Sequence, residues 1–225
     1  MILLAIDCSA NLCAASVYDA KAGKDLGRSV LDLGKGHAEH LMAVIAEALE
    51  KAGLAYRDLD AIAVSTGPGS FTGVRVGVST ARGLALALKI PAIGVTTLEA
   101  LAFEAQQTFP HRSVLVALDG GRGEIHAALY EEATILRYGP AVTTLPEMIE
   151  MASTGAPVLA GTQAGRIAEG VAGTAFEFGP LGATADIAVY ARLAAAKGAG
   201  EKPRPLYLRA PDAKPQAGFV LPRVS

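Results

Sequence analysis

The stretch that decides the fold is AIAVSTGPGSFTGVRVGVSTARGLALALK, residues 61–89. It opens with a short apolar run and continues into a Ser/Gly/Pro cluster of the kind found in turns. Apolar side chains then recur at three- and four-residue steps over residues 72–89, which contain no proline. The stretch therefore predicts a strand, a glycine-rich turn and a helix, with Ser70 or Thr72 as the residue that caps the helix.

Small residues in this predicted helix form a second pattern. Gly73, Gly77 and Ala81 are spaced four apart, which places them on one face. A glycine inside a helix costs about 1 kcal/mol relative to alanine, so two of them need a compensating gain. Close approach of another backbone supplies that gain, and the neighbour is either a segment of the same chain or another protein.

Composition narrows the class of protein. The chain has 225 residues, half of them hydrophobic, which suits one large domain or two small ones. Its net charge of −2 excludes a global basic field that would attract nucleic acid. The start, MILLAID, lacks the basic region of a signal peptide, and no apolar stretch is long enough to cross a membrane. We expect a cytoplasmic protein.

The sequence starts again after about a hundred residues. An apolar run ends at Asp7, a second ends at Asp119, and the segments that follow match at a constant offset of 112 without a gap. Residues 2–19 and 114–131 therefore predict two copies of one hairpin, although β-hairpins also resemble one another by chance. We expect lobes at residues 1–103 and 104–202, and a Pro-rich extended tail at 203–225.

Further elements follow from periodicity and from turn residues. A third strand is expected in the first lobe at 26–33, and short strands are expected at 91–95 and 158–160. Helices are expected at 37–52, 97–107, 145–152, 163–171 and 184–197. Thr97 is the expected cap of the helix at 97–107.

Two aspartates at strand ends suggest a nucleotide site between the lobes. Asp7 and Asp119 could bind the magnesium of a nucleotide, and Ser9, Gly120 and Gly121 could face its phosphates. An Asp before small residues is also an ordinary turn. No lysine completes a P-loop after the glycine-rich turn, and no GxSxG motif is present, so no catalytic residue is assigned.

Histidines do not suggest a metal site. His37 and His40 form an HxxH pair, but the HExxH motif is absent. His111 and His126 have no acidic or cysteine neighbours at ligand spacing. We expect no bound metal.

Several motifs together resemble one family. AIDCS, GHAEHL, GPGSFTGVRVG, GLALAL, GVTTLEALA, ALDGGRGEIHAALYE and PLYLRAPDAKP occur in the order typical of the TsaB family, also called YeaZ. The resemblance implies an α/β fold of the actin-like ATPase (ASKHA) type, with two ribonuclease-H-like lobes related by duplication. It also implies a non-catalytic subunit required for threonylcarbamoyladenosine (t6A) modification of tRNA.

The same resemblance implies partners. The catalytic relative TsaD carries two metal-binding histidines where this chain has Thr97 and Leu101, so this chain is expected to be non-catalytic. The resemblance implies that it pairs with TsaD. TsaE would join the assembly, tRNA would be contacted only through the complex, and the chain alone would form a homodimer. ATP and magnesium would act only within the complex. The implied partner-binding residues, on two helices, are His37, Leu41, Ile45, Gly73, Val74, Gly77 and Ala81.

These residues suggest a test and leave alternatives open. Replacing Gly77 by leucine would abolish pairing with TsaD and leave the monomer folded. The main alternative is an ATP-dependent phosphotransferase or ATPase of the same fold. A metallopeptidase is the third class considered.

Overall fold

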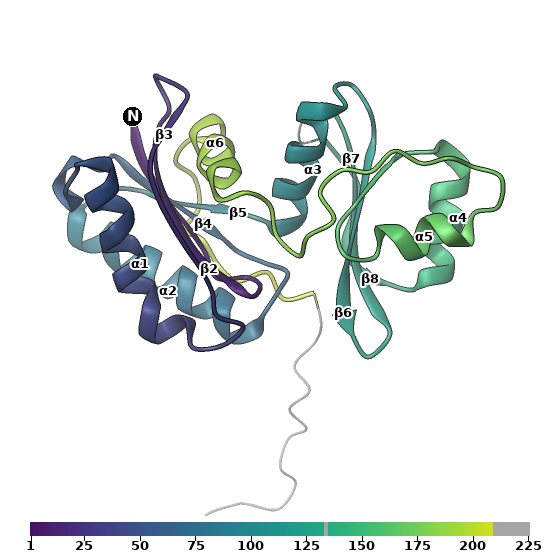
Figure 1. The fold of residues 1–225 in the computed structure, drawn as a ribbon, viewed down its shortest axis with the longest axis horizontal. Coiled ribbons are helices and arrows are strands. Elements are labelled where there is room, and N and C mark those ends of the chain that lie inside the picture. Colours follow the sequence, from purple (N-terminus) through teal and green to yellow (C-terminus); the bar gives the residue numbers. More distant parts are fainter. Residues whose placement is uncertain (133–134, 209–225) are drawn as a thin grey trace, which may run out of the picture.

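The computed structural model describes residues 1–132 and 135–208, and these residues form two β-sheets (Figure 1). The first sheet has the order β3-β2-β1-β4-β5, and its strands are Ile2–Asp7 (β1), Leu12–Asp19 (β2), Lys24–Asp32 (β3), Ala61–Ser65 (β4) and Ala92–Val95 (β5). The second has the order β8-β7-β6-β9, and its strands are Val114–Gly121 (β6), Glu124–Glu131 (β7), Ile135–Thr143 (β8) and Val158–Ala160 (β9). In each sheet three antiparallel strands are followed by a parallel strand, β4 or β9, and the first sheet adds a second parallel strand, β5.

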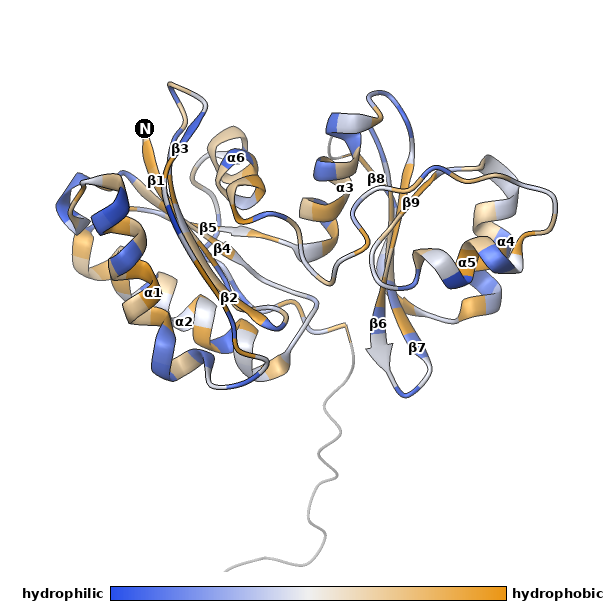
Figure 2. Cartoon of the chain, in the orientation of Figure 1, coloured by the Kyte–Doolittle hydropathy of each residue, from blue (hydrophilic) through white to orange (hydrophobic). Residues whose placement is uncertain are grey.

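Helices cover both faces of each sheet. Within the described residues they are His37–Ala52 (α1), Phe71–Leu88 (α2), Thr97–Thr108 (α3), Leu145–Gly155 (α4), Ala164–Gly170 (α5) and Ile187–Lys197 (α6). α1 and α2 pack on the outer face of the first sheet, α4 and α5 on the outer face of the second, and α3 and α6 lie between the sheets (Figure 1). Apolar strands form the centre of each layer (Figure 2).

The expected duplication is confirmed. The strands β2 at 12–19 and β7 at 124–131 are separated by the offset of 112 that the sequence indicates. The two sheets also share a strand order, except that the position of β5 in the second sheet is taken by a single bridge between Leu159 and Phe178. Both copies end in a helix, α3 or α6.

These two terminal helices cross between the copies. α3 packs against β6, β7 and β9 of the second sheet, whereas α6 packs against β1, β2, β4 and β5 of the first. α6 begins behind Asp186, whose carboxylate binds Arg28 of β3 at 2.6 Å. Packing therefore crosses the expected boundary between residues 103 and 104, and each sheet receives one helix from the other half of the chain.

Helix ends agree with the sequence in most places. α1 ends at Gly53, which adopts the left-handed conformation, and the side chain of Ser70 accepts a hydrogen bond from Gly73 N at the start of α2. Two expected ends are wrong. Thr96, not Thr97, caps α3, and the helix expected from residue 184 begins at Ile187, because Asp186 provides the cap.

The strand β8 is not predicted by the sequence, because it shows no clear apolar alternation. It has only one neighbour in its sheet, and several of its residues are exposed. Residues 203–208 contain neither helix nor strand, as expected for a Pro-rich tail, and the rest of that tail lies outside the described residues. No helix in the described part of the chain is long and apolar enough to cross a membrane.

Candidate functional site

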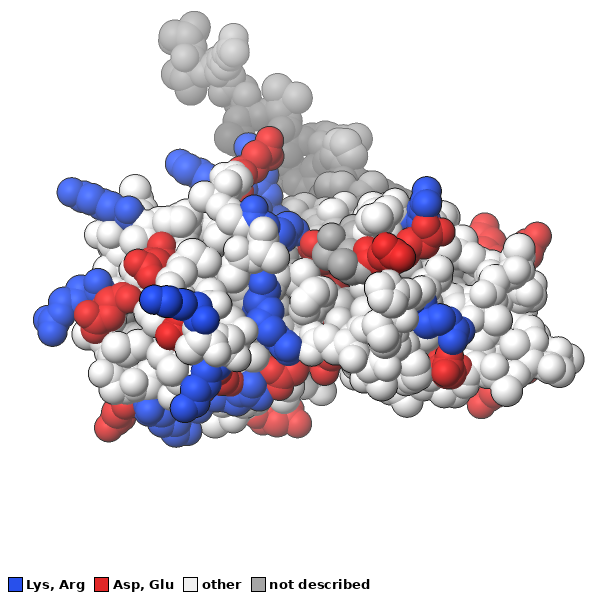
Figure 3. Space-filling model, turned by 90° about the horizontal axis from the view of Figure 1, so that it is seen from above, with Lys and Arg blue, Asp and Glu red and all other residues white. Residues whose placement is uncertain are grey.

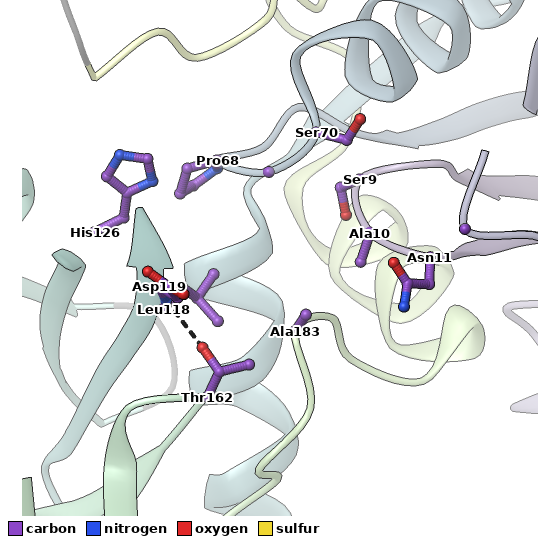
Figure 4. A pocket seen from close by; sticks show the side chains of 12 residues that line it. Ser9, Ala10, Asn11, Pro68, Ser70, Leu118, Asp119, His126, Thr162 and Ala183 are labelled. Atoms are coloured by element: carbon purple, nitrogen blue, oxygen red, sulfur yellow. Dashed lines mark hydrogen bonds between the residues drawn. The ribbon is translucent and has the colours of Figure 1, made fainter. Parts of the chain in front are cut away.

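A cavity of about 270 Å³ lies between the two lobes (Figure 4). Ser9, Asn11 and Ser70 approach it from the first lobe, and Asp119 and His126 approach it from the second. The complete lining consists of Ser9, Ala10, Asn11, Gly34, Pro68, Gly69, Ser70, Leu118, Asp119, His126, Thr162 and Ala183. Of the five expected nucleotide-binding residues, Ser9 and Asp119 therefore line this cavity, and Gly120 and Gly121 follow Asp119 at the end of β6.

Asp7 is the exception, because its side chain is only 1% exposed and binds partners inside the protein. Its Oδ1 accepts hydrogen bonds from the backbone N–H of Ser9 at 2.8 Å and from the Ser9 hydroxyl at 2.6 Å. Its Oδ2 accepts a short hydrogen bond from Thr184. Both carboxylate oxygens therefore bind internal donors, and none of these contacts is made by a residue of the second sheet.

The Asp7 contacts continue into the interior. Thr184 also lies 2.7 Å from the hydroxyl of Tyr190 on α6, which is fully buried. Burial raises the pKa of Tyr190 above its ordinary value, and the nearby Asp7 carboxylate raises it further. Asp7 thus connects the end of β1 to the segment that leads from the second lobe into α6. Sequence reasoning missed Thr184 and Tyr190, because no local pattern indicates a contact across 177 residues.

Asp119 has a different environment. Its carboxylate is exposed and accepts a hydrogen bond from Gly121 N at 2.8 Å, and its backbone N–H donates to Thr162 at 2.9 Å (Figure 4). Gly121 has a φ of 75°, so glycine suits the turn that follows β6. A side chain at Gly120 would lie 3.0 Å from the His126 ring.

We tested whether this cavity fits ATP and magnesium, which the fold family implies. Among the described residues, the cavity lining contains one carboxylate, from Asp119, and no lysine or arginine that would neutralise phosphate charge. No group of three or more His, Cys, Asp or Glu side chains that could hold a metal ion occurs among the described residues. The cavity is also smaller than the 300–1,000 Å³ typical of ligand pockets. The residues present therefore do not fit a magnesium-bound nucleoside triphosphate.

The expected partner-binding side chains point into the first lobe. Leu41 and Ile45 on α1, and Val74 and Ala81 on α2, belong to the apolar core between these helices and the first sheet, and His37 is also buried at the start of α1. A Cβ at Gly73 would clash with the Cys8 carbonyl oxygen. A Cβ at Gly77 would lie 3.6 Å from Val64. Gly73 therefore lets α2 approach β1 closely and has an explanation within the chain, whereas a Cβ at Gly77 would make only ordinary van der Waals contact.

This placement changes the test that the sequence suggests. A leucine at Gly77 would press against the first sheet and would not leave the monomer unchanged, because a packed interior does not accept four extra carbon atoms without strain.

The opposite face of the same two helices is open to solvent. On α2 the exposed positions carry small, apolar or basic residues and no acidic one, namely Phe71, Thr72, Arg75, Ser79, Arg82, Gly83, Leu86 and Ala87. Leu86 is 80% exposed, and Met42 on the neighbouring α1 is 47% exposed. α1 and α2 lie side by side on the sheet, so their solvent faces form one surface, which we call the α1/α2 face (Figure 1).

Gly83 distinguishes this face. It lies inside a helix with ordinary backbone angles, and no described residue lies within 4 Å of the position its Cβ would take. Unlike Gly73, it therefore has no packing reason within the described part of the chain for being glycine, although glycine costs about 1 kcal/mol there. Sequence reasoning missed Gly83, since it does not share the four-residue spacing of the other two.

Solved structures define the class of fold. The chain resembles YeaZ from Pseudomonas aeruginosa with a TM-score of 0.70 and 28% identity, over 92% of this chain and 99% of that one. It also resembles an inorganic polyphosphate/ATP-glucomannokinase from Arthrobacter with a TM-score of 0.55 and 14% identity, over 88% of this chain and 99% of that one, a likeness of fold alone. The protein is an α/β protein of the actin-like ATPase type with two duplicated lobes.

Sequence relatives narrow the class to a family. Residues 32–197 match the family model described as TsaD, tRNA N6-adenosine threonylcarbamoyltransferase. An uncharacterised protein of Mycobacterium tuberculosis (strain ATCC 25618 / H37Rv) is 35% identical over 96% of this chain and 95% of its own length. The tRNA threonylcarbamoyladenosine biosynthesis protein TsaB of Escherichia coli is 34% identical over 58% of this chain and 55% of its own length. The chain belongs to this threonylcarbamoyltransferase family and, within it, to the TsaB (YeaZ) group.

Proposed function

We propose that the chain is a non-catalytic scaffold subunit that acts in t6A synthesis on tRNA in the cytoplasm and pairs with a TsaD-type catalytic subunit. The names of its curated relatives support the pathway, although the chain aligns with little more than half the length of the E. coli TsaB. The cleft supports a non-catalytic role, because its lining offers neither the charges nor the metal ligands that nucleotide chemistry needs.

The α1/α2 face carries the pairing in this proposal. It carries small and apolar exposed side chains and includes a helical glycine that leaves room for another backbone. A stable pair needs about 800 Å² buried on each partner, and two adjacent helices of 16 and 18 residues offer a surface of that order. The partner-binding role assigned from the sequence to Leu41, Ile45, Gly73, Val74, Gly77 and Ala81 is therefore indirect, because these residues hold the two helices in place.

Gly83→Leu tests this proposal. A leucine at this position projects from the α1/α2 face, so we expect binding to a TsaD-type subunit to weaken more than about tenfold, measured by calorimetry. The matched control is Gly165→Leu, because Gly165 is also an exposed helical glycine with nothing within 4 Å of its Cβ position, but it lies on α5 in the second lobe. The melting temperatures of both variants show that each still folds.

Two results would contradict the proposal. If Gly83→Leu binds the TsaD-type subunit as tightly as Gly165→Leu does, the α1/α2 face is not part of the interface. Modification of tRNA by this chain alone, with no TsaD-type subunit present, would show that the chain is itself the catalyst.

We extend the proposal to two further associations. Without the catalytic subunit, two copies of the chain would use the same face in a symmetric dimer, and Gly83→Leu would then give monomers in light scattering. TsaE would join only the assembled pair, so TsaE should not bind the isolated chain. We expect contact with tRNA only through this assembly.

A second candidate function, ATP-dependent phosphotransfer or ATP hydrolysis, is favoured by the likeness of fold to a glucomannokinase. The exposed Asp119 at the cavity is the residue that this function would use. Calorimetry with ATP and magnesium separates the two functions.

A further inference from the structure

The last described segment of the chain crosses the first lobe. Residues 203–208, here called the strap, lie across the ends of β4 and β5. The Leu206 N–H donates to the Thr66 carbonyl at 2.8 Å, and Pro203 is buried so close to β5 that a Cβ at Gly94 would lie 3.2 Å from its ring. These contacts direct the strap to the first turn of α2.

At that turn the strap builds a cluster of three side chains. The Arg75 guanidinium lies 3.7 Å from the centre of the Phe71 ring and 5.4 Å from that of Tyr207. Arg75 Nε also donates to the Tyr207 hydroxyl at 2.6 Å, and the two rings are 5.6 Å apart. The rings hold one face of the guanidinium and leave its terminal nitrogens without a protein partner among the described residues.

The two aromatic side chains of this cluster are exposed, and the positive charge of Arg75 has no carboxylate partner among the described residues. Phe71 is 57% exposed and Tyr207 is 51% exposed, which is unusual for aromatic side chains that have ordered contacts. Some surface arginines pair with carboxylates, as Arg28 does with Asp186 and Arg112 with Glu177. Arg75 forms no such ion pair within residues 1–132 and 135–208, and α2 contains no acidic residue at all.

The cluster continues the α1/α2 face. Positions 71, 75, 79, 82 and 86 lie on one side of α2, so the aromatic cluster at its first turn and the exposed Leu86 at its last belong to the same exposed stripe. A partner helix on the face would run past Arg75. An arginine held by a ring on one face and by a hydroxyl at Nε binds a carboxylate in a defined direction, because less side-chain freedom is lost on binding.

We propose that Phe71, Arg75 and Tyr207 form a docking site for a segment of the partner protein that presents a carboxylate beside an apolar side chain. The proposal rests on the proposed function and adds the strap to the docking surface. The carboxylate binds the free nitrogens of Arg75, and the apolar side chain packs on the exposed rings. Tyr207 acts as a positioning residue, since it holds Arg75 through its hydroxyl and its ring.

Charge favours a protein partner over RNA. Binding to a nucleic-acid backbone needs several cations that neutralise successive phosphates, and the net charge of this chain is −2. The face seen in Figure 3 shows Lys, Arg, Asp and Glu side chains interspersed rather than a basic field. A single guanidinium oriented by Phe71 and Tyr207 matches one acidic side chain better than a polyanion.

Arg75→Gln and Tyr207→Ala test the site, with binding to a TsaD-type subunit measured by calorimetry at several salt concentrations. We expect both variants to bind about tenfold or more weakly, and Arg75→Gln to lose part of the salt dependence. Tyr207→Phe keeps the ring and loses the hydroxyl, so we expect an intermediate loss. The matched control is Arg204→Gln, an exposed arginine of the strap that contacts neither ring. Melting temperatures confirm that each variant folds.

The outcomes separate this inference from the proposed function. If Arg75→Gln and Tyr207→Ala bind normally while Gly83→Leu does not, the docking site is overturned and the proposed function stands. If Gly83→Leu also binds normally, both are overturned. If the variants bind the partner normally but the assembled complex retains less tRNA on a filter, the site takes nucleic acid and the inference is wrong.

Discussion

The two lobes share a strand order and differ in what their outer helices can do. α1 and α2 on the first lobe have 16 and 18 residues, whereas α4 and α5 on the second have 11 and 7. The first pair presents a broad face to solvent, with Gly83 near its middle, and the second pair packs over a smaller core. One copy of the duplicated unit thus has outer helices long enough for the proposed protein interface, and the other has shorter ones.

The equivalent aspartates show the same divergence. Asp7 and Asp119 end corresponding strands, yet Asp7 is buried among Ser9 and Thr184 while Asp119 is exposed at the cavity. A nucleotide site of this fold would need both carboxylates to face one cavity. Duplication therefore preserved the backbone of the site, whereas the side chains took different structural roles.

The largest difference between the lobes is expected when a glycine of α2 or of α5 is replaced by alanine. Gly73→Ala would force a Cβ into the Cys8 carbonyl oxygen, so we expect a loss of about 3 kcal/mol in the free energy of unfolding, or failure to fold. Gly165→Ala in α5 has open space and is expected to stabilise the protein by up to about 1 kcal/mol. Urea denaturation measures both. Similar values for the two variants would contradict the close approach of α2 to β1.

The next effect concerns the two aspartates. Asp7→Asn disturbs a buried acceptor with three hydrogen bonds, so we expect a loss of about 1–3 kcal/mol. Asp119→Asn is exposed and its amide oxygen can still accept from Gly121, so we expect a change within about 0.5 kcal/mol. Thr184→Val, which removes one donor to Asp7, should behave as Asp7→Asn does. Equal losses for the two aspartates in thermal denaturation would remove the distinction between them.

A smaller effect concerns the helices that follow the third strand of each copy. α1 has Gly36 at its N-cap and no side-chain cap, whereas Glu147 in α4 takes part in a capping box with Thr144. Hydrogen bonds from Thr143 and Thr144 hold the pKa of Glu147 below its usual value. A carboxylate with a depressed pKa stabilises the fold above the unfolded-state pKa of about 4.3, and this contribution disappears as the pH falls through the folded-state value.

Glu147→Gln tests this pH dependence. We expect the melting temperature of the wild type to fall more steeply than that of the variant as the pH drops below about 4.3. Glu50→Gln on α1 is the control, because no hydrogen bond to its carboxylate is formed among the described residues. Parallel melting curves for the wild type and Glu147→Gln would show that the cap does not carry the difference.

The smallest effect is expected from ATP. We expect calorimetry of the purified chain with ATP and magnesium to show no binding with a Kd below about 1 mM, because the cavity lining has one carboxylate and no lysine or arginine. Asp119→Asn should then give the same heat as the wild type. Micromolar binding with turnover, lost in Asp119→Asn, would favour the phosphotransferase and would show that the lobes still cooperate as a nucleotide site.

Much of the fold follows from local patterns. The turn at Gly67–Ser70, the helix after it and the offset between the two hairpins are all readable, because each depends on residues close together in the chain. β8 was missed and the start of α6 was misplaced, since an exposed edge strand and a cap at Asp186 carry weak local signals. The site was harder to predict. Periodicity locates the apolar face of α2, but it does not say whether that face meets the same chain or another.

The sequence by itself determined the class of fold, the duplication and the family, because apolar periodicity, turn residues and motifs are local properties of the chain. Only the tertiary structure decided which side of α2 meets solvent, that Asp7 is buried and that Tyr207 lies on Arg75. These facts depend on contacts between residues far apart in the sequence. Such contacts are fixed by how whole elements pack, and no single segment specifies them.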